Sequence, residues 1–302
     1  MKLSNILTEM GINHSCHNEK DFTSLGLAGY NNGDAVCTFL ENIKYADGMS
    51  ECITMILTND TTAKQLEYNM KDYGICIVDD PRNVFFLLHN YLVKEKEEYL
   101  PKKYDTVIGE NCAISELASI SKHNVTIGNN CVIEPFAVIS DNTVIGDNCI
   151  IRAGAHIGCV GFEYKRYNGA IFGVEHVGGV RLGNSVEIQD NCCINRAIYP
   201  WDNTVVGDYS KLDDTVHLGH GVKIGKRTMV VTHVSIGGRT KVGDDAWIGI
   251  GAIVRNAITI GDRARVNMGA VVSKPVADDE SVTGNFAIEH SKFISNMKKS
   301  TL

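Results

Sequence analysis

The residues of this chain whose types could support metal, redox or acid–base chemistry are its ten cysteines and ten histidines. Thiolates bind metals and exchange disulfides, and imidazole titrates near neutral pH. Cys192 and Cys193 are adjacent, so on a strand their side chains would point to opposite faces, which argues against a functional pair. One histidine among ten is more often structural or solvated than catalytic. Residue type alone therefore identifies no site, and the elements that position these residues have to be considered.

An aliphatic residue recurs at every sixth position through most of the chain. From Leu182 to Val272 the one exception is Pro200, and the same spacing holds from Ile127 to Ile157. A six-residue period over about 160 residues is typical of a parallel β-helix, in which three hexads form one triangular coil and the coils stack into a prism. The pattern therefore predicts a mainly β fold.

Two further positions of the hexad are distinctive. Glycine often follows the aliphatic residue, as expected where the backbone needs an unusual φ or a close approach. The fifth position is small or β-branched, and it includes Cys131 and Cys149, which lie one 18-residue coil apart. We interpret these cysteines as buried small hydrophobic residues. Neither a pair of Cys-x-x-Cys knuckles nor a secretory signal peptide is seen, so we expect reduced thiols in a cytoplasmic protein.

The change of pattern predicts three regions. Residues 1–100 lack the period and are expected to form an α/β domain. Residues 101–285 are expected to form the β-helix, with an insert loop at 159–179 where the period breaks. Residues 286–302 are expected to form a short helical tail that covers the last coil. Long loops on a rigid repeat usually bind a ligand or a partner, and this one is rich in aromatic residues.

The N-terminal region contains its own local signals. Strands are predicted at 52–57 and 75–78, and a helix at 61–73. Asp80 and Pro81 supply an N-cap and a first-turn proline for a further helix that runs to about residue 96.

Composition excludes several classes of protein. The net charge is −7, with 29 Lys and Arg against 36 Asp and Glu, so no basic surface for nucleic acid is expected. No apolar run approaches 18 residues, so no membrane span is expected. A polar enzyme that acts on an activated or amphipathic substrate is compatible with these limits.

The chain resembles the UDP-3-O-acylglucosamine N-acyltransferase family, whose members are hexapeptide-repeat enzymes of lipid A biosynthesis. Four segments that occur in the same order carry the resemblance, and together they are more specific than the hexads. They are Gly33-Asp34-Ala35-Val36-Cys37-Thr38-Phe39-Leu40-Glu41-Asn42-Ile43-Lys44-Tyr45, then Ile157-Gly158-x-x-Gly161-Phe162-x-Tyr164, then Val186-Glu187-Ile188 with Asn195-Arg196-Ala197, and finally residues 212–225, which include Asp213 and His220.

The resemblance implies a left-handed parallel β-helix with a small N-terminal α/β domain and a short C-terminal helix. It implies a homotrimer with sites between subunits that moves an acyl group, of the 3-hydroxyacyl type in this family, from a phosphopantetheine thioester to the amine of a UDP-linked sugar. The thioester would belong to acyl carrier protein or CoA, and no cofactor would be bound permanently. His220 would be the general base and Asp213 its acidic partner, while backbone N–H groups of Gly237 or Gly238 would receive the oxyanion.

The same resemblance assigns residues to substrate binding. Phe39 and Tyr45 would flank uracil with Asn42 hydrogen-bonding nearby, although aromatic residues at this spacing could equally belong to the core. Phe162 and Tyr164 would contact substrate from the insert loop. Arg196 is a possible partner for a phosphate, although a surface cation is usually only solvated.

Departures from the family pattern leave alternatives open. Ala257 stands where the family often has a second histidine, Val160 replaces an aspartate of its loop motif, and the C-terminal helix is short. A sibling enzyme that acylates another UDP- or dTDP-linked amino sugar, with acyl-CoA as donor, is one alternative. A catalytically inactive β-helix scaffold is another. Zinc is not expected, because His217, His220 and His233 do not follow the ligand pattern of hexad-repeat carbonic anhydrases.

Overall fold

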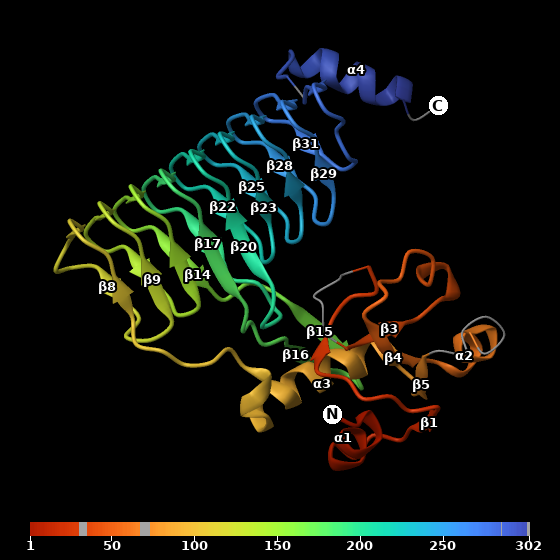
Figure 1. Cartoon of the computed structure of the whole chain (residues 1–302). Helices are drawn as coiled ribbons and strands as arrows, with labels where there is room; N and C mark the ends of the chain where they lie inside the picture. The colour runs from red at the N-terminus through yellow and green to blue at the C-terminus, as the bar shows by residue number, and fades with distance from the viewer. Residues whose placement is uncertain (30–34, 67–72, 285, 301–302) are drawn as a thin grey trace. The chain divides into compact units, whose positions relative to one another are not determined.

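The computed structural model describes residues 1–29, 35–66, 73–284 and 286–300. Gly33 and Asp34 of the first family segment, and most of the second half of the helix predicted at 61–73, lie outside these residues. Contacts divide the chain into two compact units (Figure 1). The first contains Met1–Tyr104, Val160–Gly179 and Arg196–Asn203, and the second contains Asp105–Cys159, Val180–Asn195 and Thr204–Leu302.

The second unit is a prism whose three faces are parallel sheets, as the hexads predicted (Figure 1). Face 1 consists of β7 (Ala113–Ile114), β10 (Val132–Ile133), β13 (Ile150–Ile151), β18 (Glu187–Ile188), β21 (Lys211–Leu212), β24 (Met229–Val230), β27 (Trp247–Ile248), β30 (Arg265–Val266) and β32 (Ser281–Val282). Face 2 consists of β8 (Ser119–Ile120), β11 (Val138–Ile139), β14 (His156–Cys159), β19 (Cys193–Asn195), β22 (His217–Leu218), β25 (Ser235–Ile236), β28 (Ile253–Val254) and β31 (Val271–Val272). Face 3 consists of β6 (Val107–Ile108), β9 (Val125–Ile127), β12 (Thr143–Ile145), β17 (Gly179–Leu182), β20 (Asn203–Val206), β23 (Lys223–Ile224), β26 (Lys241–Val242) and β29 (Thr259–Ile260).

Strand register reports the length of each coil. Leu218 pairs with Ile236, one 18-residue coil further along the chain. The insert that sequence analysis expected lies between Ile157 and its strand partner Ile194. The pairing of Ile194 with Leu218, however, spans 24 positions. The six surplus positions fall within Arg196–Asn203, the segment that belongs to the first unit.

The six-residue spacing on either side of Pro200 gave no sign of this second excursion. Pro200 lies within this second excursion from the prism. The excursion lengthens its coil by six positions, which is one full hexad, so the aliphatic residues before and after it remain in phase. A test based on the period cannot detect an insertion of that size.

The interior of the prism confirms the interpretation of the repeat cysteines. Cys131 and Cys149 are fully buried among the aliphatic residues. The Cys131 thiol donates to the Gly146 carbonyl at 3.1 Å, and the Cys149 thiol donates to the Gly183 carbonyl at 3.0 Å. Both thiols thus pair with the backbone of the following coil, which is how a weak donor is satisfied in a narrow core.

The corner glycines are explained by close approach between coils. A Cβ atom at Gly128 would lie 2.7 Å from the backbone carbon of Gly146 in the next coil. Among the glycines that directly follow an aliphatic position, Gly158 alone has a positive φ, at 86°. Left-handed backbone occurs instead at the fourth hexad position, often at asparagine, as in Asn130 and Asn148.

The first unit is built on a five-stranded sheet in the order β1-β5-β4-β3-β2. Its elements are α1 (Leu3–Glu9), β1 (Ser15–His17), β2 (Ser24–Leu25), β3 (Val36–Leu40), η1 (Ile43–Tyr45), β4 (Ile53–Thr58), α2 (Asp60–Leu66), β5 (Gly74–Ile77), α3 (Pro81–Glu95) and η2 (Glu97–Tyr99). The predicted strands correspond to β4 and β5. The predicted capping of α3 is confirmed, because the Asp80 carboxylate accepts from the Asn83 amide at 3.0 Å and Pro81 is in the first turn.

The insert differs from the predicted loop in two respects. It forms an antiparallel hairpin of β15 (Tyr164–Tyr167) and β16 (Ala170–Gly173). It also groups with the first unit rather than with the β-helix domain in which we had placed it. The hairpin packs on α3, where the Asn83 side chain donates to the Arg166 carbonyl at 3.1 Å and that of Asn90 donates to the Gly173 carbonyl at 2.7 Å.

The expectation that all thiols are reduced was wrong for one pair. Cys16 of β1 and Cys76 of β5 are joined in a disulfide. The two residues are direct partners in this antiparallel pair, with Cα atoms 4.0 Å apart, so pairing of the strands brings their sulfurs together. Sequence spacing gave no indication of it, because the two cysteines are 60 residues apart.

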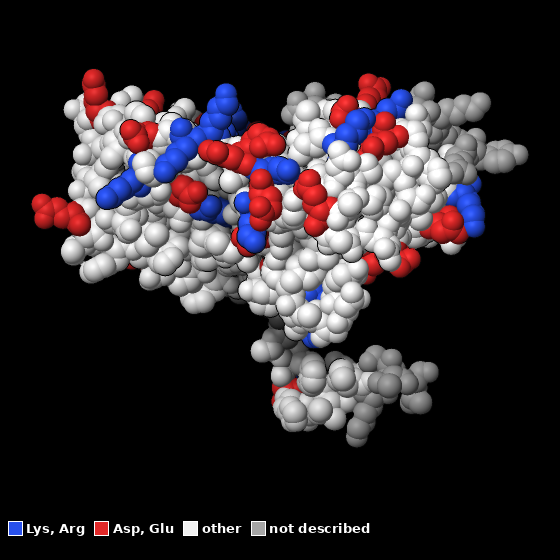
Figure 2. Space-filling view, turned by 90° about the horizontal axis from the view of Figure 1, so that it is seen from below, with Lys and Arg blue, Asp and Glu red and all other residues white. Residues whose placement is uncertain are grey.

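The C-terminal tail forms α4 (His290–Ser300), which confirms a short helix. The expected cover over the last coil is not formed by its apolar residues: Phe293 is 49 % exposed and Met297 is 52 % exposed. No helix among the described residues has the length and apolarity that a membrane crossing requires. Figure 2 shows Lys and Arg intermingled with Asp and Glu on the face in view.

Candidate active site

His220 lies at the corner between β22 and β23, two residues after the buried Leu218. Gly221 follows it with a φ of 69°, which turns the chain into the next face. The half-buried imidazole rests against Gly238 of the following coil, where a Cβ atom would lie only 2.7 Å from Nε2. Glycine at position 238 therefore makes the space in which the His220 ring lies.

Thr204 holds this corner in place. Its hydroxyl, on a fully buried side chain, donates to the Asn195 carbonyl at 2.6 Å and accepts from the Gly221 amide at 2.9 Å. One side chain thus connects the coil of Asn195 to the turn that carries His220. Sequence analysis did not identify Thr204, because a small β-branched residue in a repeat looks like ordinary core.

A polar cluster lies on the outer surface of face 2 in the same coils. The Nε2 atom of His217 is 3.0 Å from the Asn195 side-chain oxygen. The amide nitrogen of Asn195 donates to the Cys159 sulfur at 3.3 Å. Burial lowers the pKa of His217, which favours the neutral imidazole. With an amide oxygen as partner, Nε2 carries the proton and Nδ1 is the basic nitrogen.

The two glycines assigned to the oxyanion differ in their hydrogen bonds. The Gly237 N–H donates to the Val254 carbonyl at 2.9 Å, so it is already used between coils. The Gly238 carbonyl accepts from Ala257, while the described hydrogen bonds include none from the Gly238 N–H. Of the pair, Gly238 retains a donor for a ligand.

Asp213 is not brought to His220. Its carboxylate accepts from the Thr232 amide at 3.0 Å and from the Asp214 amide at 2.9 Å. Asp213 lies at the corner between faces 1 and 2, whereas His220 lies at the corner between faces 2 and 3. Among the described residues no hydrogen bond or ion pair joins them, so the expected orienting partnership is not formed within one chain.

The residues assigned to uracil are separated by their environments. The Phe39 ring packs 4.9 Å from the Phe85 ring, which is the core role left open by sequence analysis. Asn42 caps η1, and its side-chain oxygen accepts from the Lys44 amide at 3.0 Å. Tyr45 is 54 % exposed. Of the three, Tyr45 and Asn42 are exposed, and the Lys44 ammonium lies over the Tyr45 ring, 4.9 Å from its centroid.

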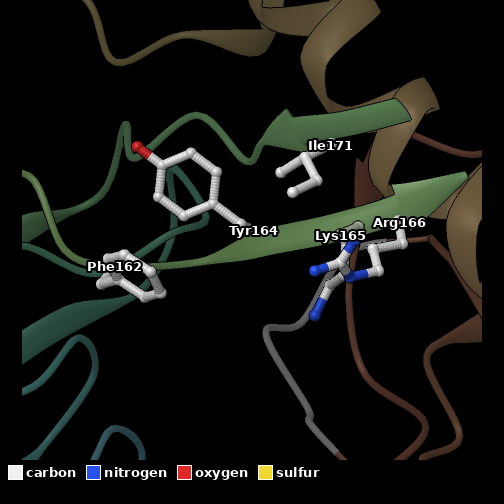
Figure 3. Close-up of a pocket in the computed structure, with 5 residues that line it drawn as sticks. All are labelled: Phe162, Tyr164, Lys165, Arg166 and Ile171. Carbon is white, nitrogen blue, oxygen red and sulfur yellow. The ribbon is translucent and has the colours of Figure 1, made fainter. Parts of the chain in front are cut away.

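The hairpin residues form a shallow pocket of about 300 Å³ (Figure 3). Its lining comes from both strands and comprises Phe162, Tyr164, Lys165, Arg166 and Ile171. The Phe162 and Tyr164 rings are 4.8 Å apart, and Phe162 is 86 % exposed. The pocket thus combines two aromatic rings with the Arg166 guanidinium, a set that suits a flat or amphipathic anionic ligand, whereas the Lys165 ammonium is already paired with the Glu163 carboxylate.

Arg196 is almost fully buried, in contrast to the solvated surface cation that is usual for arginine. It begins the second excursion from the prism and belongs to the first unit. Within the described part of the chain, no three His, Cys, Asp or Glu residues are arranged to hold a metal ion.

Comparison with known proteins finds similarity over parts of the chain. The model for the bacterial transferase hexapeptide (six repeats) matches residues 124–159 and 239–274. A UDP-3-O-acylglucosamine N-acyltransferase 2 of Legionella pneumophila is 44 % identical over 97 residues, 32 % of this chain and 28 % of that protein. A UDP-3-O-acylglucosamine N-acyltransferase 1 of Francisella tularensis is 39 % identical over 106 residues, 34 % of this chain and 30 % of that protein.

Among solved structures, a UDP-N-acetylglucosamine acyltransferase from Campylobacter jejuni superposes with a TM-score of 0.52. Its identity is 18 %, and the match covers 65 % of this chain and 79 % of that one, which supports the fold. The fold of the second unit is a left-handed β-helix with hexapeptide repeats. The resemblance of this hexapeptide-repeat protein to the UDP-3-O-acylglucosamine N-acyltransferases is confirmed, over a stretch that spans less than a third of those relatives.

Proposed function

We propose that the protein is an N-acyltransferase that moves an acyl group, such as a 3-hydroxyacyl chain, from a phosphopantetheine thioester to the amine of a UDP-linked amino sugar. The substrate we favour is UDP-3-O-acylglucosamine, because curated relatives with 44 % and 39 % identity are named for it. The observation that carries the proposal is the His220 imidazole, held against Gly238 at a corner of the prism.

The chemistry requires a base, because an alkyl ammonium is not a nucleophile. In the proposed reaction His220 removes a proton from the sugar amine as its nitrogen attacks the thioester carbon. The oxygen of the tetrahedral intermediate accepts from the Gly238 N–H, the donor that the ladder between coils leaves available. Collapse breaks the C–S bond, and the departing thiolate takes the proton from the His220 imidazolium.

The remaining parts of the proposal concern substrate and partners. Tyr45 and Asn42 would contact the nucleobase, and the hairpin pocket around Phe162 and Tyr164 would contact substrate.

A prism is convex on each face, so we infer a homotrimer in which clefts between copies hold two substrates. Ile253 and Val271, which are 52 % and 65 % exposed and adjacent on face 2, provide an apolar strip for such a contact. Acyl carrier protein or CoA would deliver the acyl group, and a cytoplasmic location would supply both.

The test is a mass-spectrometric assay of purified protein with UDP-3-O-acylglucosamine and, separately, with UDP- and dTDP-linked amino sugars that lack the ester. Each is offered with acyl carrier protein and CoA thioesters. We expect an acylated product from the esterified UDP-glucosamine and a loss of 10²–10⁴-fold in turnover for His220→Ala. The control is His233→Asn, which replaces an exposed histidine and suits the φ of 60° at that position.

The outcomes separate the alternatives. Product from only an unesterified sugar would indicate a sibling enzyme that acts on another nucleotide-linked amino sugar. Ala257, in place of a second histidine, favours that hypothesis. No product with any pair of substrates would refute the proposal in favour of a non-catalytic scaffold. Unchanged turnover in His220→Ala would leave the activity but remove its assigned base.

A further inference from the structure

Cys159 and Cys193 lie side by side on the outer surface of face 2. Their sulfur atoms are 3.1 Å apart, and both residues are half-buried. A bulge produces this arrangement, because Ile157 pairs with Ile194 while Cys159 pairs with Asn195. Gly158, with a φ of 86°, supplies the extra residue, which moves Cys159 to the outer surface. The partner of Cys193 is therefore Cys159 of the preceding coil, not its neighbour in sequence.

We propose that Cys159 and Cys193 form a site of reversible oxidative modification, at which a two-electron oxidant of the hydroperoxide class joins the two sulfurs in a disulfide. The Cys159 thiolate attacks the peroxide oxygen, which breaks the O–O bond and leaves a sulfenic acid. The Cys193 sulfur then attacks that sulfur and loses its proton, and hydroxide leaves as water. In sum, two thiols and one hydrogen peroxide give one disulfide and two waters, and a dithiol reductant reverses the step.

The geometry requires little movement. Bonded sulfurs are about 2.05 Å apart, so closing the observed separation needs a shift of about 1 Å, which side-chain rotation can supply. The hydrogen bonds also define the roles of the two sulfurs. Hydrogen bonding to Cys159 raises the pKa of the Cys193 thiol, which favours the protonated form of Cys193. The Asn195 amide donates to the Cys159 sulfur at 3.3 Å and would also donate to a thiolate formed there.

The surroundings distinguish this pair from the other thiols. Cys131 and Cys149 also lie in adjacent coils, but they are fully buried inside the prism and donate to backbone carbonyls. A solvent-borne oxidant therefore reaches Cys159 and Cys193 before those two. Cys52 is half-buried in the first unit with its sulfur 3.1 Å from the Ser50 hydroxyl, so it supplies an accessible thiol of another environment for comparison.

The modification would affect the site of the proposed function, on which this last step rests. A disulfide sulfur is a weaker acceptor than a thiolate, so oxidation weakens the hydrogen bond that the Asn195 amide donates to Cys159. The other end of that amide contacts His217, three residues before His220 and on the strand that leads to it. Oxidation is therefore expected to disturb His217 and the adjoining corner.

The experiment treats the native, full-length protein with hydrogen peroxide, blocks the remaining thiols, and maps the peptides by mass spectrometry. We expect a peptide that links Cys159 to Cys193, formed before Cys52 is oxidised and lost after treatment with dithiothreitol. Cys16–Cys76 serves as an internal standard, because it is linked before treatment. The variant Cys193→Ser should accumulate sulfenic acid at Cys159, whereas Cys52→Ser should still form the link.

The inference is overturned if the native protein forms no Cys159–Cys193 link, or if Cys159 proceeds to sulfinic acid with Cys193 still free. Peptide mapping detects the disulfide without an activity assay, so the proposed modification is tested separately from the acyltransferase proposal. When turnover is measured as well, oxidation of the wild-type protein should lower the acyl-transfer rate at least 10-fold. Reduction with dithiothreitol should then restore that rate. If the disulfide-linked protein kept the full acyl-transfer rate, the inferred effect on the active site would be refuted, and the modification itself would stand.

Discussion

Replacing Gly238 with alanine tests the position of His220 without removing any functional group. The Cβ atom would lie 2.7 Å from Nε2, 2.9 Å from Cε1 and 3.0 Å from Cδ2 of the imidazole. Non-bonded contacts of this kind settle at about 3.5–4.0 Å, so the ring must retreat by about 1 Å. The Gly238 N–H remains, and the proposed oxyanion donor is therefore preserved.

The expected effect follows from that displacement. Misplacing a catalytic group by about 1 Å costs on the order of 10²-fold in rate, which corresponds to about 2.7 kcal/mol of transition-state free energy. Stability should change little, because the obstructing atoms are the end of a half-buried side chain that can turn aside. The variant should therefore fold and assemble as wild type does while kcat falls.

The assay compares kcat for acyl transfer with the thermal unfolding midpoint. The matched control is Gly207→Ala, whose Cβ atom would meet the backbone of Gly225 at 2.7 Å. Overpacking against backbone costs about 1–3 kcal/mol of stability, so the control should show the opposite pattern, a lower midpoint with kcat retained per folded molecule. A folded Gly238→Ala variant with the wild-type kcat would refute the argument that His220 acts from this position.

Three other predictions concern stability. Thr204→Val leaves a buried carbonyl and a buried amide without their partner and should lower the unfolding free energy by about 2–3 kcal/mol in urea titration, whereas Thr204→Ser should retain most of it. Burial lowers the pKa of His89 to about 4, against about 6.5 when unfolded. Between these pH values the unfolded chain binds a proton that the folded chain does not. The contribution of neutral His89 to the unfolding free energy is therefore complete above pH 6.5, and about 3 kcal/mol of it is lost as the pH falls to 4. The unfolding free energy of His89→Gln should depend less on pH. Reduction of Cys16–Cys76 should lower the stability of the first unit by about 2–4 kcal/mol, seen as earlier proteolysis of that unit in urea.

The fold of the second unit was predictable from sequence because one physical cause determines both the pattern and the structure. The first position of each hexad points into the narrow core and is aliphatic, so the period of the sequence is the period of the coil. Pro200 shows the limit of that argument, since an excursion of one full hexad preserves the phase. Cys16 and Cys76 show another limit, because pairing of distant strands is a tertiary property that spacing does not encode.

The candidate site was predictable in part. The structure has His220 at a corner of the coil, beside Gly238, and its role as a base stays a prediction, while no contact with Asp213 forms within one chain. Residues about one hexad apart lie at successive corners of the triangle, so a whole face separates their side chains. Thr204 and the Asn195 contact with His217 join neighbouring coils across the second excursion, and a one-dimensional sequence gives no direct sign of them.

Both excursions leave the prism at the same corner, after Cys159 and after Asn195, and each returns to the strand of face 3 that continues its own coil. Neither displaces a single inward residue of the coils that follow. This corner can therefore accept new polypeptide without repacking the rest, much as a display scaffold does. A binding peptide grafted at the hairpin tip, Asn168–Gly169, would be presented with the repeat architecture intact.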